Sequence, residues 1–121
     1  MVYKFNFRIA YADTDAGGIV YHARYVEIAE RARMDAFKDV NDPNGVFVIK
    51  ELTVKYMKPL RLNDEFVVET TFKKSGAATM DIEQKFVKDG DNYAILTGIA
   101  VYVNKEMKPI RLSDAWLKMG D

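Results

Sequence analysis

The sequence contains no cysteine and only one histidine, His22. Without thiols the chain has no disulfide, no thiolate nucleophile and no thiolate metal site. One imidazole is also too few for the zinc sites that proteins build from several histidines. The longest apolar stretch, 94–103, is interrupted by Thr97 and Gly98 and is shorter than the roughly 20 residues that span a bilayer. The chain also opens without the long apolar segment of a signal peptide. We therefore expect a cytoplasmic protein with no metal site and no membrane insertion.

An excess of charge of one sign is missing as well, because 18 Lys and Arg residues balance 18 Asp and Glu residues. No overall field therefore favours nucleic acid or anionic lipid as a partner. The apolar fraction of 49% excludes a disordered chain. The 121 residues are expected to form one domain, 1–121, close to the size at which association adds useful burial.

Hydrophobic periodicity predicts one strand, one long helix and four further strands. Their expected ranges are a strand at 3–11, a helix at 22–38, and strands at 46–58, 65–72, 79–87 and 93–103. Short turns between the last four strands make these strands mostly antiparallel. The helix stripe and one sheet face must bury each other. An α+β fold follows, in which a curved antiparallel sheet of about five strands wraps around one central helix.

The helix has an apolar stripe at helical spacing and charged residues elsewhere. Glu27 precedes Arg31 by four residues and Glu30 precedes Arg33 by three, so both pairs are expected on a solvated face. Ser113 is a candidate N-cap for a last helical turn. The stripe consists of Tyr25, Val26, Ala29, Ala32, Ala36 and Phe37.

The segment that joins the first strand to the helix combines Asp15, Gly17, Gly18 and His22. The first N–H groups of a helix lack intrahelical partners and carry partial positive charge, so those of His22 and Ala23 can stabilise an oxyanion. A carboxylate beside them is the minimum equipment for attack on a carbonyl group. An aspartate before a helix also forms turns or caps, which is the alternative role of Asp15.

Three segments resemble the hotdog-fold acyl-CoA thioesterases of the 4-hydroxybenzoyl-CoA type, and most closely the bacterial branch associated with the Tol–Pal system. They are the run YADTDAGGIVYHARYVEIAERAR at 11–33, the segment LTVKYMKPLRLND at 52–64 and the closing KPIRL at 108–112. The first segment is specific, because the acid, the glycines, the aromatic residue and the helix start all occur in register. The later two are weaker on their own.

This resemblance implies hydrolysis of acyl-CoA thioesters without a cofactor. Asp15 matches the family's catalytic carboxylate, which acts as nucleophile or general base, and the backbone near His22 matches the donors that polarise the thioester carbonyl. It also implies homodimers whose sheets join edge to edge, often paired again as a homotetramer, with active sites that use both chains. Acyl carrier protein is a further possible partner.

Several neighbours of Asp15 are candidates for supporting roles. Gly17 and Gly18 allow close approach of the substrate, and Tyr21 and Tyr25 are expected to pack or line the pocket. His22 is expected to contact or orient the substrate, because the coenzyme A thiolate leaves with little need of protonation. General acid catalysis by His22 and a surface role are the alternatives, and Asp13 is expected to be a turn residue.

Coenzyme A carries phosphates, so basic residues near the site are candidate contacts. Arg61 and Arg111 are favoured because each follows a strand-ending proline. The full set of candidates is Lys58, Arg61, Lys73, Lys74 and Arg111.

Two other functions fit the same scaffold, because fold does not fix function. One is a hotdog hydratase or dehydratase, although such enzymes usually use a histidine with an acidic partner from the central helix. The other is a non-catalytic module that binds acyl carrier protein or envelope proteins. The sequence leaves the preferred acyl group open.

Overall fold

The computed structural model describes residues 1–120 and contains five strands and one long helix, with short helical turns near both ends. The strands are β1 (Tyr3–Arg8), β2 (Val46–Tyr56), β3 (Glu65–Lys74), β4 (Thr79–Lys88) and β5 (Asp91–Val103). The helices are α1 (His22–Phe37) and α2 (Asp114–Leu117), with 3-10 turns η1 (Tyr11–Asp13) and η2 (Lys118–Gly120).

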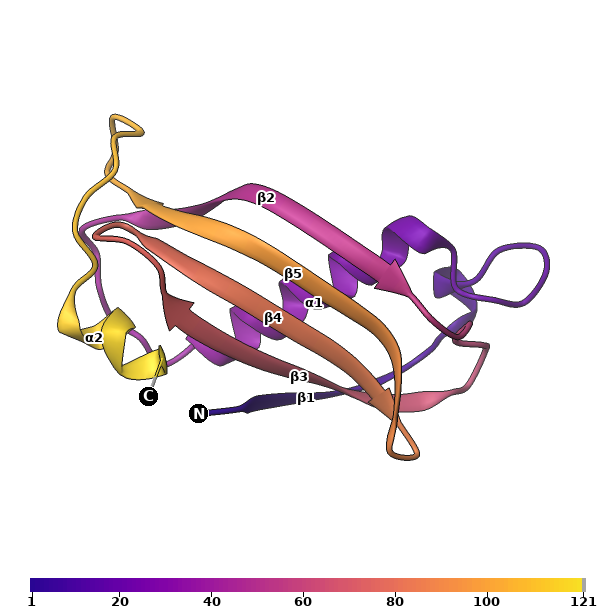
Figure 1. The fold of residues 1–121 in the computed structure, drawn as a ribbon. Helices are drawn as coiled ribbons and strands as arrows, with labels where there is room; N and C mark the ends of the chain where they lie inside the picture. The colour runs from indigo at the N-terminus through magenta and orange to yellow at the C-terminus, as the bar shows by residue number, and fades with distance from the viewer. Residues whose placement is uncertain (121) are drawn as a thin grey trace.

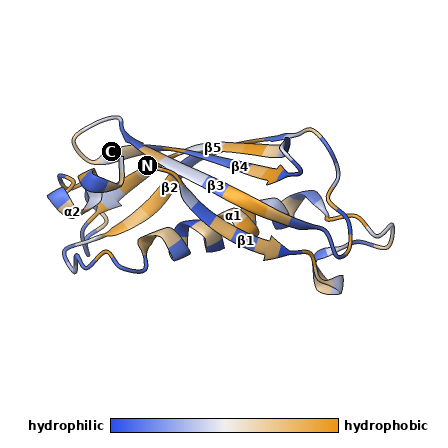
Figure 2. Ribbon diagram, turned by 90° about the horizontal axis from the view of Figure 1, so that it is seen from below, coloured by the Kyte–Doolittle hydropathy of each residue, from blue (hydrophilic) through white to orange (hydrophobic). Residues whose placement is uncertain are grey.

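The five strands form one sheet in the order β1-β3-β4-β5-β2, and every neighbouring pair is antiparallel. The sheet curves around α1, which lies across one of its faces (Figure 1). Hydrophobic and hydrophilic residues alternate along the strands, and α1 lies below the sheet in Figure 2. The prediction of an α+β fold with a curved five-stranded sheet around a central helix is confirmed.

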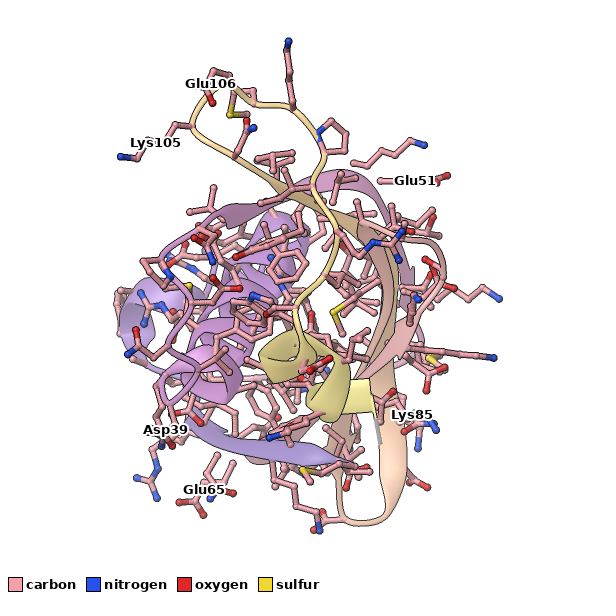
Figure 3. The ribbon with its side chains drawn as sticks, turned by 90° about the vertical axis from the view of Figure 1, so that its left-hand side faces the viewer. Asp39, Glu51, Glu65, Lys85, Lys105 and Glu106 are labelled. Atoms are coloured by element: carbon pink, nitrogen blue, oxygen red, sulfur yellow. The ribbon has the colours of Figure 1, made fainter. Side chains whose placement is uncertain are left out.

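The outer face of the sheet is polar. Glu51 and Lys85 point away from α1 in Figure 3. None of the helices within residues 1–120 is long and apolar enough to cross a membrane.

Helix α1 is held against the sheet by Tyr25, Ile28, Ala29 and Ala32, all of which are buried. The alanines let the helix approach the sheet closely, as their place in the predicted stripe suggests. The predicted apolar stripe of the helix was wrong at its margins, however. Ile28 lies at its centre, whereas Val26, Ala36 and Phe37 are only partly buried, because the sheet covers a face centred between Tyr25 and Ala32.

Arg33 is the main departure from the predicted helix pattern. It is buried rather than solvated, and its Nη1 donates to Gln84 Oε1 at 3.0 Å instead of pairing with Glu30. The Gln84 amide nitrogen in turn donates to the carbonyl of Ala29 at 2.8 Å and to the Thr70 hydroxyl at 3.1 Å. The prediction for the Glu30 and Arg33 pair is therefore wrong. The expected pair of Glu27 and Arg31 is present at 2.9 Å.

The first strand is shorter than its alternation predicted. It ends at Arg8, and Tyr11 lies in the turn η1 with 82% of its surface exposed. The cause is local: the Asp13 carboxylate accepts the Ala10 N–H at 2.8 Å and closes a 3-10 turn. That turn leads the chain away from the sheet, toward the loop that contains Asp15.

The C-terminal segment is tied to the connection between α1 and β2 by Asp42. Its Oδ2 accepts the Ser113 hydroxyl at 2.8 Å and the Trp116 indole N–H at 3.1 Å. Ser113 stands at the N-cap position of α2 but makes no side-chain bond to that helix, so its expected capping role is wrong. Its hydroxyl is committed to Asp42 instead.

The hydrogen bonds to Asp42 lower its pKa from 3.8 to about 2. The nearby Tyr102 hydroxyl contributes most to the lowered pKa, although its geometry is too poor to count as a hydrogen bond. The Asn44 N–H and the Ser113 hydroxyl contribute next. Because the folded-state pKa is depressed, this stabilisation is present above about pH 3.8 and is lost as the pH falls toward about 2.

We predict that Asp42→Asn lowers the melting temperature at pH 7. The difference in melting temperature between variant and wild type should become smaller as the pH falls from 5 to about 2. Thermal unfolding followed by circular dichroism across this range measures both effects. Asp39→Asn is the matched control, because Asp39 lies nearby and points into solvent (Figure 3). A difference in melting temperature that stays constant with pH would contradict the role given to the Asp42 carboxylate.

Candidate active site

The loop that contains Asp15 is closed by backbone hydrogen bonds. The Asp15 N–H donates to the carbonyl of Ile19 at 2.9 Å, and the Gly18 N–H donates back to the carbonyl of Asp15 at 3.0 Å. Gly18 has a φ of 76°, a left-handed conformation that favours glycine. Thr14 and Val20 form an isolated bridge at the base of the loop. The loop is therefore a defined turn at one end of the sheet (Figure 1).

The Asp15 carboxylate makes one hydrogen bond within residues 1–120. Its Oδ1 accepts the Gly17 N–H at 2.8 Å, which is the turn predicted as the alternative role of Asp15. Its Oδ2 has no hydrogen-bond partner in this part of the chain, and the residue is exposed. The turn thus orients the carboxylate and leaves one oxygen available. The structural and the catalytic roles of Asp15 are compatible.

Helix α1 begins at His22 without a side-chain cap. Tyr21 at the N-cap position is extended, with φ −72° and ψ 149°, and its side chain makes no capping hydrogen bond. Among the first N–H groups, that of Arg24 donates to the carbonyl of Tyr21 at 3.0 Å. His22 and Ala23 are exposed. Their N–H groups therefore remain available to a ligand at the positive end of the helix dipole.

A pocket of about 380 Å³ brings the carboxylate and the helix start together. It contains Asp15, Tyr21 and His22 of the predicted site, together with Lys58. Its complete lining is Asp15, Ile19, Val20, Tyr21, His22, Tyr25, Tyr56, Met57, Lys58 and Pro59.

Other predicted residues lie outside this lining. Gly17 and Gly18 shape the loop behind Asp15, and Ala23 follows His22 in the first helical turn. Arg61 forms a backbone bridge to Ile19, so it is close to the loop without lining the pocket.

Two tyrosines on one side of the pocket join the helix to β2. The Tyr56 hydroxyl donates to the carbonyl of His22 at 2.8 Å, and its ring meets Tyr25 edge-on with centroids 5.1 Å apart. The Tyr25 hydroxyl accepts the Leu60 N–H at 3.2 Å, and burial raises the pKa of Tyr25. Tyr56 was not among the predicted site residues. The sequence feature that could have identified Tyr56 is its position in the segment 52–64, three residues before Pro59.

The basic candidates are divided between the two ends of the sheet. Lys58 lines the pocket, but its Nζ is 2.9 Å from Asp91 Oδ2, whose hydrogen bond and charge raise the pKa of Lys58. Arg61 is exposed and forms no ion pair within residues 1–120.

Arg111, Lys73 and Lys74 lie at the opposite end of the sheet. Leu112, directly after Arg111, donates its N–H to the carbonyl of Ala77 in the connection that follows Lys74. The structure therefore does not bring Arg111, Lys73 or Lys74 to the pocket of their own chain. The reason is that β3 and β5 run away from the pocket before these residues are reached (Figure 1).

Asp13 is a turn residue, as predicted, since it accepts the Ala10 N–H. Sequence reasoning also missed Arg24. Its Nη2 donates to the carbonyl of Ala12 at 3.0 Å, and its Nε lies 3.5 Å from Asp13 Oδ1. Arg24 thereby fixes η1 against the first turn of α1. Within residues 1–120, no group of three or more metal-binding side chains is close enough to hold a metal ion.

The family model described as the thioesterase superfamily matches residues 17–95, and the chain belongs to this family. The chain is similar to the acyl-CoA thioesterase YbgC of Haemophilus influenzae, with 36% identity over 95 residues that cover 72% of this chain and 70% of the relative.

Solved structures agree with this assignment. The chain resembles a probable thioesterase from Bartonella henselae with a TM-score of 0.84 and 26% identity, covering 93% of this chain and 100% of the other. A 1,4-dihydroxy-2-naphthoyl-CoA thioesterase from Synechocystis shares the fold, with a TM-score of 0.88 and 14% identity over 99% of this chain and 96% of the other. The predicted family and hotdog fold are confirmed.

We predict that Tyr56→Phe destabilises the start of α1, because it removes the hydroxyl that donates to the carbonyl of His22. The expected loss in unfolding free energy is about 0.5 kcal/mol, the low end for a hydrogen bond, since the site is exposed. Urea unfolding measures this loss. Tyr11→Phe is the control, because the Tyr11 side chain is 82% exposed. Equal stabilities of the two variants would contradict the anchoring role of Tyr56.

Proposed function

We propose that this protein hydrolyses acyl-CoA thioesters to a free acid and coenzyme A, with Asp15 as the nucleophile or general base. The supporting observation is one pocket that joins the Asp15 carboxylate to the uncapped start of α1. The thioester carbonyl oxygen lies at the N–H groups of His22 and Ala23. There the helix dipole and the two donors stabilise the negative charge that develops during attack.

Two chemical routes fit this arrangement. In the first, the carboxylate takes a proton from water while the water oxygen bonds to the carbonyl carbon. The carbon–sulfur bond then breaks, and coenzyme A departs as a thiolate. In the second, a carboxylate oxygen of Asp15 attacks the carbon directly, the carbon–sulfur bond breaks and coenzyme A departs as a thiolate, and water then hydrolyses the mixed anhydride that results. The Gly17 N–H that holds Oδ1 favours the orientation needed for either route.

The remaining pocket residues have binding roles in this proposal. His22 and Tyr21 contact the substrate near the thioester. Gly17 leaves room for the Asp15 carboxylate, since a Cβ at Gly17 would lie 3.2 Å from Oδ1, and Gly18 allows the positive φ of the loop. Arg61 has an exposed side chain without an ion pair in the described chain, so it is available to a phosphate of coenzyme A. Lys58 contributes positive charge at the pocket rim while it remains paired with Asp91.

We also propose that two copies pair through their β2 strands. β2 is an edge strand with an unpaired side, and such edges form ladders with other chains. Exposed apolar side chains gather along it, since Val46 is 60% and Ile49 is 39% exposed. The other edge, β1, has no exposed large apolar side chain within its bounds. An antiparallel two-fold pairing places the Val46 end of one β2 beside the Tyr56 end of the other.

We predict that Asp15→Asn retains the fold and lowers turnover by at least about 10²-fold, the lower range for loss of a general base. The asparagine side-chain oxygen can still accept the Gly17 N–H, so the substitution removes the charge and keeps the turn. Thiol release from a panel of acyl-CoA and acyl carrier protein thioesters measures turnover. Asp39→Asn is the control for loss of an exposed carboxylate.

Turnover of Asp15→Asn within a few fold of wild type, with wild-type circular dichroism, would reject Asp15 as the reactive group. Failure of wild type to release thiol from any thioester would reject the hydrolase function itself. A single turnover in water labelled with oxygen-18 then tests the anhydride route, because label found in Asp15 can arise only when water attacks the Asp15 carboxyl carbon of the anhydride.

We predict that the double variant Val46→Lys, Ile49→Lys separates the chains, because it places like charges on facing edges of β2. Light scattering after gel filtration measures the mass. Val2→Lys is the control, because Val2 is also exposed, at 51%, but lies beside β1. An unchanged mass of the double variant would exclude the β2 pairing.

A further inference from the structure

A second pocket, of about 430 Å³, lies between the C-terminal half of α1 and the start of β2. This volume falls within the usual range for small-molecule sites, about 300–1,000 Å³. Its walls are mainly apolar and include the only tryptophan of the chain. The principal apolar residues are Met34, Phe37, Val46, Phe47, Ile49 and Trp116.

A single cation, Arg33, lines this pocket. The residue is only 7% exposed, and its Nη1 donates to Gln84 Oε1 at 3.0 Å. Nε and Nη2 make no hydrogen bond within residues 1–120, and no carboxylate of that range lies within ion-pair distance. Buried guanidinium groups are normally paired with anions. Burial also lowers the pKa of Arg33, and the charge of Glu30 opposes this shift.

Two acidic residues line the same pocket and do not supply the missing partner. Asp42 already accepts hydrogen bonds from the Ser113 hydroxyl and the Trp116 indole, and also from Asn44. Glu30 is exposed to solvent and forms no ion pair with Arg33. The guanidinium therefore retains free donors inside a mostly apolar cavity.

We propose that this pocket binds an organic carboxylate with an apolar body, held by the guanidinium of Arg33 at its acidic end and by the aromatic walls along its length. A carboxylate supplies two acceptor oxygens, which match the free donors of a guanidinium, and a charge-assisted pair is stronger than a neutral hydrogen bond. An apolar body of moderate size is buried by Phe37, Phe47 and Trp116.

Such a carboxylate has two possible sources. One is a free acid, such as the product of thioester hydrolysis. The other is a second carboxylate at the far end of a bound acyl group. The second source rests on the proposed function, and on the β2 pairing that sets this pocket of one copy beside the Asp15 pocket of the other.

The test uses octanoate as the probe and 1-octanol as its neutral counterpart. Because Trp116 is the only tryptophan and lines the pocket, its fluorescence reports occupancy directly, without turnover. We expect saturable binding of octanoate by wild type and weaker binding of octanol. Arg33→Gln should weaken octanoate binding by roughly tenfold, as for loss of a charge-assisted contact, and leave octanol binding within about twofold.

The matched control is Arg31→Gln, because it removes the same charge from an exposed position of the same helix. It should bind octanoate as wild type does. Met34→Glu is a second variant that keeps the test valid if Arg33→Gln does not fold. Met34 is 63% exposed, so a glutamate there repels the anion and leaves the hydrogen bond between Arg33 and Gln84 in place. We expect weaker octanoate binding by this variant and little change for octanol.

Thiol release from glutaryl-CoA and pentanoyl-CoA separates the two sources. A wild-type preference for glutaryl-CoA that disappears in Arg33→Gln supports the far-end carboxylate. Competitive displacement of octanoate by free acids, without such a preference, supports the free acid. The proposal is overturned if wild type shows no saturable response to octanoate, or if Arg33→Gln and Met34→Glu both bind it as wild type does. Neither result would affect the prediction for Asp15→Asn.

Discussion

The position of helix α1 on the sheet determines where the candidate site can form. Ile28, Ala29 and Ala32 pack against the sheet with almost no exposed surface, and the small alanines allow close approach. The buried amide of Gln84 donates to the carbonyl of Ala29. A buried hydrogen bond of this kind fixes a helix along its axis more narrowly than apolar contact, because an amide left unpaired there would be costly. The N-terminus of α1 is consequently held beside the loop of Asp15.

In the loop, Asp15 both completes a turn and lines the candidate site. Asp15 terminates a turn through its Oδ1, and the same carboxylate faces the pocket. Arg24 and Asp13 brace the preceding turn against the first turn of α1. Carboxylate and helix terminus are therefore positioned by short local contacts rather than by a separate element. The proposed mechanism needs oxyanion donors that are oriented before the reaction, and this bracing would supply that orientation.

Periodicity and turn chemistry sufficed to predict the strand order along the chain, the helix and the loop. Asp89 and Gly90 both have positive φ, at 51° and 80°, as the hairpin signal between β4 and β5 requires. Features that depend on distant partners were missed. Arg33 was assigned to solvent from its spacing to Glu30, whereas its partner Gln84 lies on β4.

The same limit applies to the basic residues. A strand-ending proline gives no information about which end of the sheet it occupies, so Arg111 was grouped with Arg61 although the chain places them at opposite ends. The oligomeric state and the catalytic role of Asp15 stay predictions.

The two pockets lie too far apart to be connected within one chain by a short substrate. At about 1.5 Å of rise per residue, Arg33 lies about 16 Å along the axis of α1 from His22. An extended five-carbon acyl group anchored at Asp15 is shorter than this separation. In the proposed β2 pairing, in contrast, the pocket that contains Val46 would approach the pocket that contains Tyr56 of the other copy. The proposed β2 pairing therefore links three features: the unpaired edge, the exposed apolar side chains along it and the guanidinium of Arg33 near its start.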